Sequence, residues 1–248
     1  MSRVGIKHWL VNKPIAHRGL HDGNKLIPEN SMLAFRNAVH NNYAIELDIV
    51  FTKDGEVIVF HDYNTLRLCG LNSNVSDLTL KEIKDLNLCN TNEKISTLSE
   101  VLQVVNGEVP ILIEIKNKGK VGYFEYSVYE IVKSYKGDYA IQSFNPRSLR
   151  WFYKQRPDVI RGHLASRCHQ VKLPYYKRYI SKNLLSLGLS KPDFIGYKIE
   201  DLPYKSVTKI RSKLPVLGWT INTNSKLEHA KLYCDNYIFE NIDIPKLE

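Results

Sequence analysis

Strand-like and helix-like segments alternate along nearly the whole chain, and this regularity limits the fold more than any other feature. Short apolar runs such as 109–116 and 194–199 are each followed by a stretch with helical character. Such alternation is typical of a parallel sheet whose strands are joined through helices. A chain of 248 residues is long enough to form an α/β barrel as one domain.

Nine segments qualify as strands, and two of them are expected to form a hairpin. The pair Asp54-Gly55 is a turn signal, so the run that ends at His61 should return antiparallel to residues 43–49. Eight parallel strands then remain, which is the number in a (β/α)8 TIM barrel. We predict this α/β fold, with residues 1–248 as a single domain and a small insertion at about 63–95. A doubly wound open sheet is the alternative, but no glycine-rich phosphate loop supports it.

Acidic side chains gather near the ends of the predicted strands, where barrels of this type hold their active sites. Glu46 and Asp48 are two residues apart on one strand and therefore face the same side. The hairpin brings His61 close to Asp48, and Glu114 ends a later strand. Three carboxylates at one barrel mouth would repel one another unless a cation lies among them. Oxygen ligands favour Ca²⁺ or Mg²⁺, so we predict one divalent ion bound by Glu46, Asp48 and Glu114.

Basic and titratable side chains accompany the acidic cluster. Arg18 ends the first predicted strand (14–18), and Lys116 lies two residues after Glu114, on the same side of its strand. An arginine, a lysine and a metal ion form a set suited to a phosphate group. His17 and His61 can act as general acid and general base, because imidazole titrates near neutral pH. The combination suggests cleavage of a phosphoester.

The order of these motifs resembles the glycerophosphodiester phosphodiesterase family. The first block contains HRG (17–19), PEN (28–30), ExD (46–48), TKDGEVIVFHD (52–62) and IEIK (113–116). The likeness continues through LTLKEIKDL (78–86), STLSEVL (96–102), IQSFNP (141–146) and GWTIN (218–222), and so covers about 15–242. The fixed spacings within the first block make this resemblance specific.

The resemblance implies a metal-dependent phosphoric diester hydrolase built on a (β/α)8 barrel. Its substrates would be small glycerophosphodiesters such as glycerophosphocholine and glycerophosphoethanolamine, and its products glycerol 3-phosphate and an alcohol. The family roles fall on His17 and His61 (acid–base pair), Glu46, Asp48 and Glu114 (Ca²⁺ or Mg²⁺ ligands), and Arg18, Lys116 and Trp219 (substrate). The chain departs from the family at its last strand, where Glu240-Asn241 stands in place of the usual Asp before Pro.

Charge and cysteine content agree with a small-molecule enzyme. The net charge of +9 comes from cations spread along the chain, which argues against a nucleic-acid partner. The four cysteines have neither CxxC nor zinc spacing and are expected to be free thiols in a reducing compartment. The N-terminal residues contain no signal-peptide apolar region, and no run reaches transmembrane length. We therefore predict a cytoplasmic location.

Two other functions stay open from the sequence. The first is a lysophospholipase D-type phosphodiesterase that acts on membrane lysolipids. Its weak contact with the membrane surface would come from the basic, aromatic stretch VKLPYYKRYI (171–180), although a barrel helix with a solvated basic face explains that stretch as well. The second is a non-catalytic phosphodiester-binding protein, which would not need both histidines and all three carboxylates.

Overall fold

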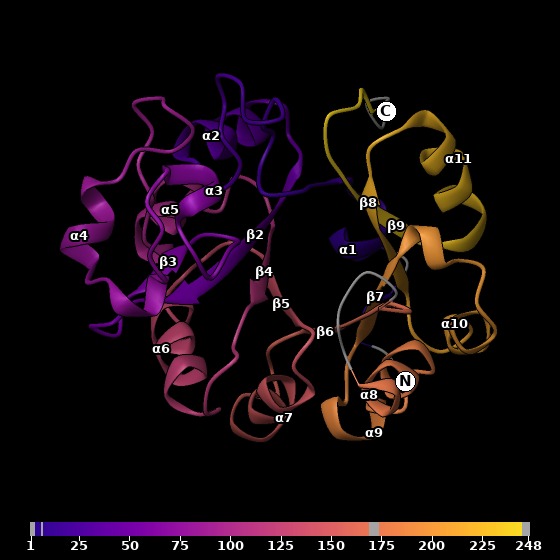
Figure 1. The fold of residues 1–248 in the computed structure, drawn as a ribbon. Coiled ribbons are helices and arrows are strands. Elements are labelled where there is room, and N and C mark those ends of the chain that lie inside the picture. Colours follow the sequence, from indigo (N-terminus) through magenta and orange to yellow (C-terminus); the bar gives the residue numbers. More distant parts are fainter. Residues whose placement is uncertain (1–2, 6, 169–173, 245–248) are drawn as a thin grey trace. The chain divides into compact units, whose positions relative to one another are not determined.

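The computed structural model describes residues 3–5, 7–168 and 174–244, and the chain divides into two compact units (Figure 1). We call residues 16–139 the site unit, because they include every predicted site residue except Trp219. The second unit combines residues 1–15 with residues 140–248. Strand β1 (Ile15–Ala16) lies at the boundary.

A hairpin and one parallel neighbour form the centre of the site unit. Strand β2 (Ala44–Phe51) pairs antiparallel with β3 (Val57–Val59), as predicted from the Asp54-Gly55 turn. Strand β4 (Ile111–Ile115) pairs parallel with β2 and puts Glu114 opposite Asp48. The hairpin is thus confirmed, and two of the predicted metal ligands lie on neighbouring strands.

Two helices of the site unit begin at capping boxes. Thr79 and Thr97 each accept a hydrogen bond from the backbone of the glutamate three residues later, and that glutamate accepts one from the threonine backbone in return. The glutamate of the Thr97 box is Glu100. The helical segments of this unit are α2 (Met32–His40), α3 (Leu66–Cys69), η1 (Val75–Asp77), α4 (Leu80–Asp85), α5 (Leu98–Val105) and α6 (Tyr123–Val132).

Residues 63–95 pack against the hairpin. The apolar cluster that joins them consists of Val50, Ile58, Phe60, Leu68, Val75, Ile83, Leu88 and Ile95. At the hairpin turn, the Asp54 carboxylate accepts a hydrogen bond of 3.0 Å from the backbone N–H of Leu80, where α4 begins. These contacts fix the segment that follows His61 against the strands that carry the carboxylates.

Parallel strands and helices alternate in the second unit. Each strand from β5 to β9 pairs parallel with the next, which confirms the predicted alternation. The strands are β5 (Tyr139–Ser143), β6 (Arg161–Ala165), β7 (Phe194–Lys198), β8 (Val216–Ile221) and β9 (Asn236–Phe239). The helical segments are α1 (Trp9–Asn12), α7 (Pro146–Gln155), α8 (Tyr175–Lys182), α9 (Leu187–Ser190), η2 (Ile199–Asp201), α10 (Lys205–Arg211) and α11 (Asn224–Tyr233).

The first predicted strand is shorter than expected. It should have reached Arg18, but β1 ends at Ala16 because Arg18 and Gly19 have φ angles of 55° and 78°. A Cβ on Gly19 would lie 3.0 Å from atoms of Ala34 and Phe35, so the turn passes close to α2. This turn aims the residues after β1 at the neighbouring strand β2.

The structure bears on the membrane alternative in two ways. Among the described residues, no helix is both long enough and apolar enough to span a bilayer. Of the basic, aromatic stretch 171–180, residues 171–173 lie outside the described residues, and the remainder lies in and just before α8.

Candidate active site

Three carboxylates converge on β2 and β4. One oxygen from each of Glu46, Asp48 and Glu114 lies within 4.8 Å of the others. Glu46 and Asp48 share a face because β2 side chains alternate, and each is only 1% exposed. The parallel register with β4 adds Glu114. The predicted convergence of these residues is confirmed, while their role as metal ligands stays a prediction.

Two cations lie against Asp48. The Lys116 Nζ atom is 3.3 Å from Asp48 Oδ1 and 3.4 Å from Glu114 Oε1, and Arg18 Nε is 3.4 Å from Asp48 Oδ2. Burial alone would raise the pKa of Asp48, but the charges of Lys116, His61 and Arg18 hold that pKa well below its usual range. Asp48 is therefore ionised at neutral pH.

The positive charges of Lys116 and Arg18 do not neutralise all three carboxylates. Burial, and then the charges of Asp48 and Glu114, raise the pKa of Glu46 well above its usual range. The pKa of Glu114 is also raised, because burial outweighs the opposing charge of Lys116. A divalent ion among the three oxygens would supply the missing positive charge, and an all-oxygen donor set suits Ca²⁺ or Mg²⁺. The residues thus fit the predicted ion.

His17 is held beside the carboxylates by the turn after β1. The backbone N–H of Arg18 donates to Glu46 Oε2 at 3.2 Å, and the N–H of Gly19 donates to the Glu46 carbonyl at 3.2 Å. His17 Nε2 then lies 4.0 Å from Glu46 Oε2. One carboxylate of the cluster therefore positions both the first histidine and the arginine that follows it.

His61 is oriented by its neighbour Asp62. The His61 Nδ1 and Asp62 Oδ1 atoms are 2.5 Å apart, and Arg67 donates to the same carboxylate from Nε at 2.6 Å. Burial opposes ionisation of Asp62, yet the contacts with His61 and Arg67 hold its pKa well below the usual range. An ionised carboxylate only accepts hydrogen bonds, so Nδ1 carries the proton and Nε2 is the nitrogen left for chemistry.

Glu29 is a site residue that the sequence did not reveal. Its carboxylate accepts hydrogen bonds from Arg18 Nη1 at 2.6 Å and from Arg67 Nη1 and Nη2 at 2.9 and 2.7 Å. It thereby connects Arg18, beside the carboxylates, with Arg67, which holds Asp62. The PEN motif marked this position, but its partner Arg67 is 38 residues away and no periodicity links the two.

The Glu29 bridge is expected to make folding stability depend on pH. Burial opposes ionisation of Glu29, but hydrogen bonds from Arg67 and the charge of Arg18 lower its pKa from 4.5 to about 2. A lowered folded-state pKa adds stability above pH 4.5 that disappears as the pH falls towards 2. Glu29→Gln should therefore lower the free energy of unfolding by about 3 kcal/mol at pH 7, and by much less at pH 2.5.

Denaturant unfolding of both proteins across this pH range measures the difference. The matched control is Glu108→Gln, which makes the same chemical change at an exposed glutamate of the site unit. A wild-type advantage over Glu29→Gln that stays constant down to pH 2 would contradict the ion-pair explanation.

Trp219 is the one predicted site residue in the second unit. It lies on β8, and its ring packs edge-on against Phe144 with centroids 5.6 Å apart. The indole Nε1 is buried and has no hydrogen-bond partner within the described part of the chain. The role of Trp219 near the substrate stays a prediction.

Two adjoining cavities lie in the site unit, and the first of them reaches His61. One of about 470 Å³ is lined by His61, Asp62, Tyr63, Arg67 and Lys116 among others. The second, of about 570 Å³, shares Tyr63 and Lys116 and extends along the loop that follows β4. Lys118 Nζ lies 3.5 Å from the centre of the Tyr63 ring between them. The first cavity therefore offers space for a small substrate directly against His61 and Lys116.

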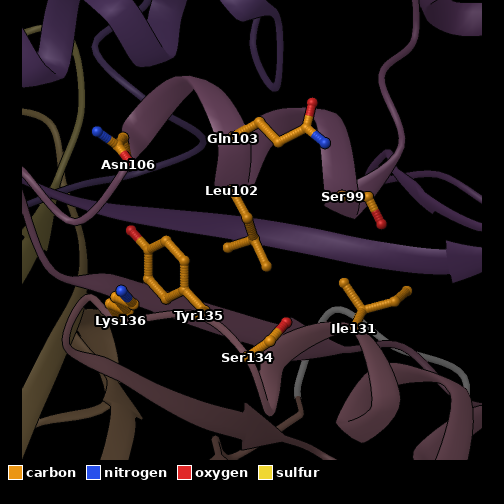
Figure 2. A pocket seen from close by; sticks show the side chains of 8 residues that line it. All are labelled: Ser99, Leu102, Gln103, Asn106, Ile131, Ser134, Tyr135 and Lys136. Atoms are coloured by element: carbon orange, nitrogen blue, oxygen red, sulfur yellow. The ribbon is translucent and has the colours of Figure 1, made fainter.

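A separate cavity of about 460 Å³ lies between α5 and α6 (Figure 2). Figure 2 shows Leu102 and Gln103 of α5 on one side and Ile131, Ser134 and Tyr135 on the other. Its lining includes Asn106, which precedes β4, and Ser134, Tyr135 and Lys136, which precede β5, so it lies towards the amino ends of those strands. Barrel active sites lie at the opposite, carboxyl ends, so this cavity is not part of the candidate site.

The alternating strands and helices define an α/β protein of the TIM-barrel type, and the acidic cluster on β2 and β4 gives it a candidate metal site. A sequence model of the glycerophosphoryl diester phosphodiesterase family matches residues 17–242, and the chain belongs to that family. The match spans every predicted site residue from His17 to Trp219.

Individual relatives agree with the family assignment. A glycerophosphodiester phosphodiesterase of Caldanaerobacter subterraneus is 35% identical over 58% of this chain and 63% of its own length. A lysophospholipase D of Rattus norvegicus is 35% identical over 62% of this chain and 52% of its own length. The chain thus aligns with less than two thirds of these relatives' length.

Solved structures identify the fold. A phosphodiesterase of Oleispira antarctica, in complex with the product sn-glycerol-3-phosphate, has a TM-score of 0.77 at 22% identity and covers 93% of both chains. Likeness at this identity concerns the fold alone. The chain has the (β/α)8 barrel fold that was predicted from the alternation of its segments.

Proposed function

We propose that this protein is a metal-dependent glycerophosphodiester phosphodiesterase. Small diesters such as glycerophosphocholine and glycerophosphoethanolamine would be hydrolysed to glycerol 3-phosphate and an alcohol. The observation that carries the proposal is the convergence of three carboxylates, two of them buried and one partly buried, with two cations and two histidines within one unit. The family match and the relatives named as phosphodiesterases support it.

Arg18 and Lys116 are proposed to bind the phosphate. Both are largely buried and paired with Asp48, so their charges are held in place before the substrate arrives. Fixed positive charge stabilises the negative charge that grows on the non-bridging oxygens in the transition state. When bound to Glu46, Asp48 and Glu114, the divalent ion would add Lewis-acid stabilisation and lower the pKa of the attacking hydroxyl.

We assign the removal of a proton to His61. Its Nδ1–H is held by the ionised Asp62, which fixes the tautomer and stabilises the imidazolium that forms when Nε2 accepts a proton. The proton would come from water or from the glycerol 2-hydroxyl, and the second route gives a cyclic phosphate first. His17, beside Glu46, would then protonate the leaving alcohol.

The test is release of glycerol 3-phosphate from glycerophosphocholine and glycerophosphoethanolamine. The wild-type protein should release it with Ca²⁺ or Mg²⁺ and not with EDTA. His17→Ala should remove the release and thus rule out a contaminating enzyme. A complete failure on both substrates under all metal conditions would reject the proposed activity.

A lysophospholipase D activity is the second candidate. The rat relative is named for that activity, and α8 offers a surface suited to lipid. Release of choline from lysophosphatidylcholine would distinguish it from the first candidate. The non-catalytic alternative would retain ligand binding without product release.

The organisation and location of the protein stay predictions. We propose residues 1–248 as a single domain with an insertion at about 63–95. The four cysteines are free thiols, which supports the predicted cytoplasmic location.

A further inference from the structure

Helix α8 exposes most of its side chains. None of its residues is buried, and Tyr175, Tyr176, Tyr179 and Ile180 are 75%, 61%, 47% and 38% exposed. Four large apolar or aromatic side chains on eight consecutive residues are an unusual content for a solvated surface. The apolar face needs an explanation beyond packing within its own unit.

These four side chains form one continuous face. At 100° per residue they fall within an arc of about 140° on the helix surface. The opposite side is the one that contacts the protein, because Ser181 Oγ donates to the Ser166 carbonyl at 3.0 Å. Tyr197 and Ser206 anchor the end of the helix by donating to the Lys182 carbonyl at 3.2 and 3.1 Å. The helix is thus held with its apolar face outward.

Positive charge borders this face. Lys177 lies on one edge of the arc, and Lys182 and Arg178 lie on the other. No acidic residue occurs between Asp158 and Asp193 in the sequence, so no carboxylate of the helix itself offsets the charges of Lys177, Arg178 and Lys182. An aromatic face with cations along both edges complements a surface that has an anionic outer layer over an apolar interior.

We propose that α8 is a docking surface for anionic lipid bilayers. The tyrosines and Ile180 would enter the interface between head groups and acyl chains, where Tyr is favoured, and the cations would pair with anionic head groups. Nucleic acid is the other polyanion that such charge attracts. Lipid is favoured because Ile180 offers no stacking surface to a base and lies on the same outward arc as the tyrosines.

The place of α8 in the chain, after the carboxyl end of β6, indicates what membrane docking would achieve. The segment that leads to α8 leaves β6 at its carboxyl end, Ala165, the end of a barrel strand at which active sites lie. Attachment there would bring the protein to the surface where lysolipids and the products of lipid deacylation arise. The docking inference stands independently of the proposed activity, since binding to vesicles is measured without turnover.

The experiment is cosedimentation of the full chain with vesicles of phosphatidylcholine alone and of phosphatidylcholine mixed with phosphatidylglycerol. Binding is expected only to the anionic vesicles and should weaken as salt is raised. Lys177→Gln/Lys182→Gln should weaken it by about fivefold for each charge removed. Tyr175→Ser/Tyr176→Ser should weaken it by roughly tenfold without any change of charge.

A matched pair of tyrosines elsewhere gives the control. Tyr123 and Tyr126 on α6 are 67% and 46% exposed, and α6 has no lysine or arginine. Tyr123→Ser/Tyr126→Ser should therefore bind the vesicles as the wild type does. Equal binding by the Tyr175→Ser/Tyr176→Ser variant and the wild type would overturn the proposal. So would tighter binding to single-stranded RNA that is lost in that variant, which would assign the face to nucleic acid.

Discussion

His61→Ala is expected to lower kcat for glycerophosphodiester hydrolysis by about 10²–10⁴-fold, the usual contribution of a general acid–base residue. The expectation rests on the Asp62 contact, which leaves His61 Nε2 as the nitrogen that can exchange a proton with substrate. KM should change much less than kcat, because the proposed phosphate-binding residues Arg18 and Lys116 are unchanged in this variant. Steady-state kinetics with saturating metal measures both constants.

A second histidine in the same unit supplies the control. His40 ends α2 and is exposed, so His40→Ala should retain wild-type kinetics. Asp62→Asn should give an intermediate loss in kcat, because an amide can present its oxygen or its nitrogen to Nδ1 and no longer selects one tautomer. A loss of less than tenfold in His61→Ala, with the protein folded, would remove His61 from the proposed mechanism.

The parts of this site that sequence predicts are those governed by short-range periodicity. Alternation along a strand was enough to put Glu46 and Asp48 on one face, and an Asp-Gly turn was enough to return the chain to His61. The capping box at Thr97 follows from residues three apart. Each of these inferences uses a geometric rule that holds whatever the rest of the protein does.

Other parts depend on contacts that no local rule encodes. The Glu29 carboxylate joins Arg18 and Arg67 across loops, and only the three-dimensional structure brings these side chains together. The first strand ended early because Arg18 adopts a positive φ, which a non-glycine sequence does not announce. A helical wheel likewise identifies the apolar arc of α8, but the contact of Ser181 with Ser166 decides that the arc faces outward.

Removal of the divalent ion is expected to abolish activity and to destabilise the protein at the same time. An ion that binds only the folded state adds about 2.7 kcal/mol to the free energy of unfolding at a concentration of one hundred times its Kd. Adding Ca²⁺ or Mg²⁺ to EDTA-treated protein should therefore raise Tm. The recovery of glycerol 3-phosphate release should follow the same metal concentration, because both report occupation of one site.

Glu46→Gln distinguishes the effect of the bound ion from the effect of the side chain on folding stability. The pKa of Glu46 is raised in the folded state. Its contribution to stability is therefore present at low pH and is lost as the pH rises through that folded-state pKa. The ionised carboxylate thus destabilises the metal-free protein. A neutral glutamine should raise the metal-free Tm at pH 7, remove most of the metal-induced increase in Tm, and lower kcat by on the order of 10²–10³-fold.

Glu56→Gln, at an exposed residue of the hairpin, should change none of these quantities. A Glu46→Gln protein that gains as much Tm from metal as the wild type would show that the ion binds elsewhere. A higher metal-free Tm together with a lower kcat would show that the buried carboxylate of Glu46 contributes to ion binding and not to the stability of the fold.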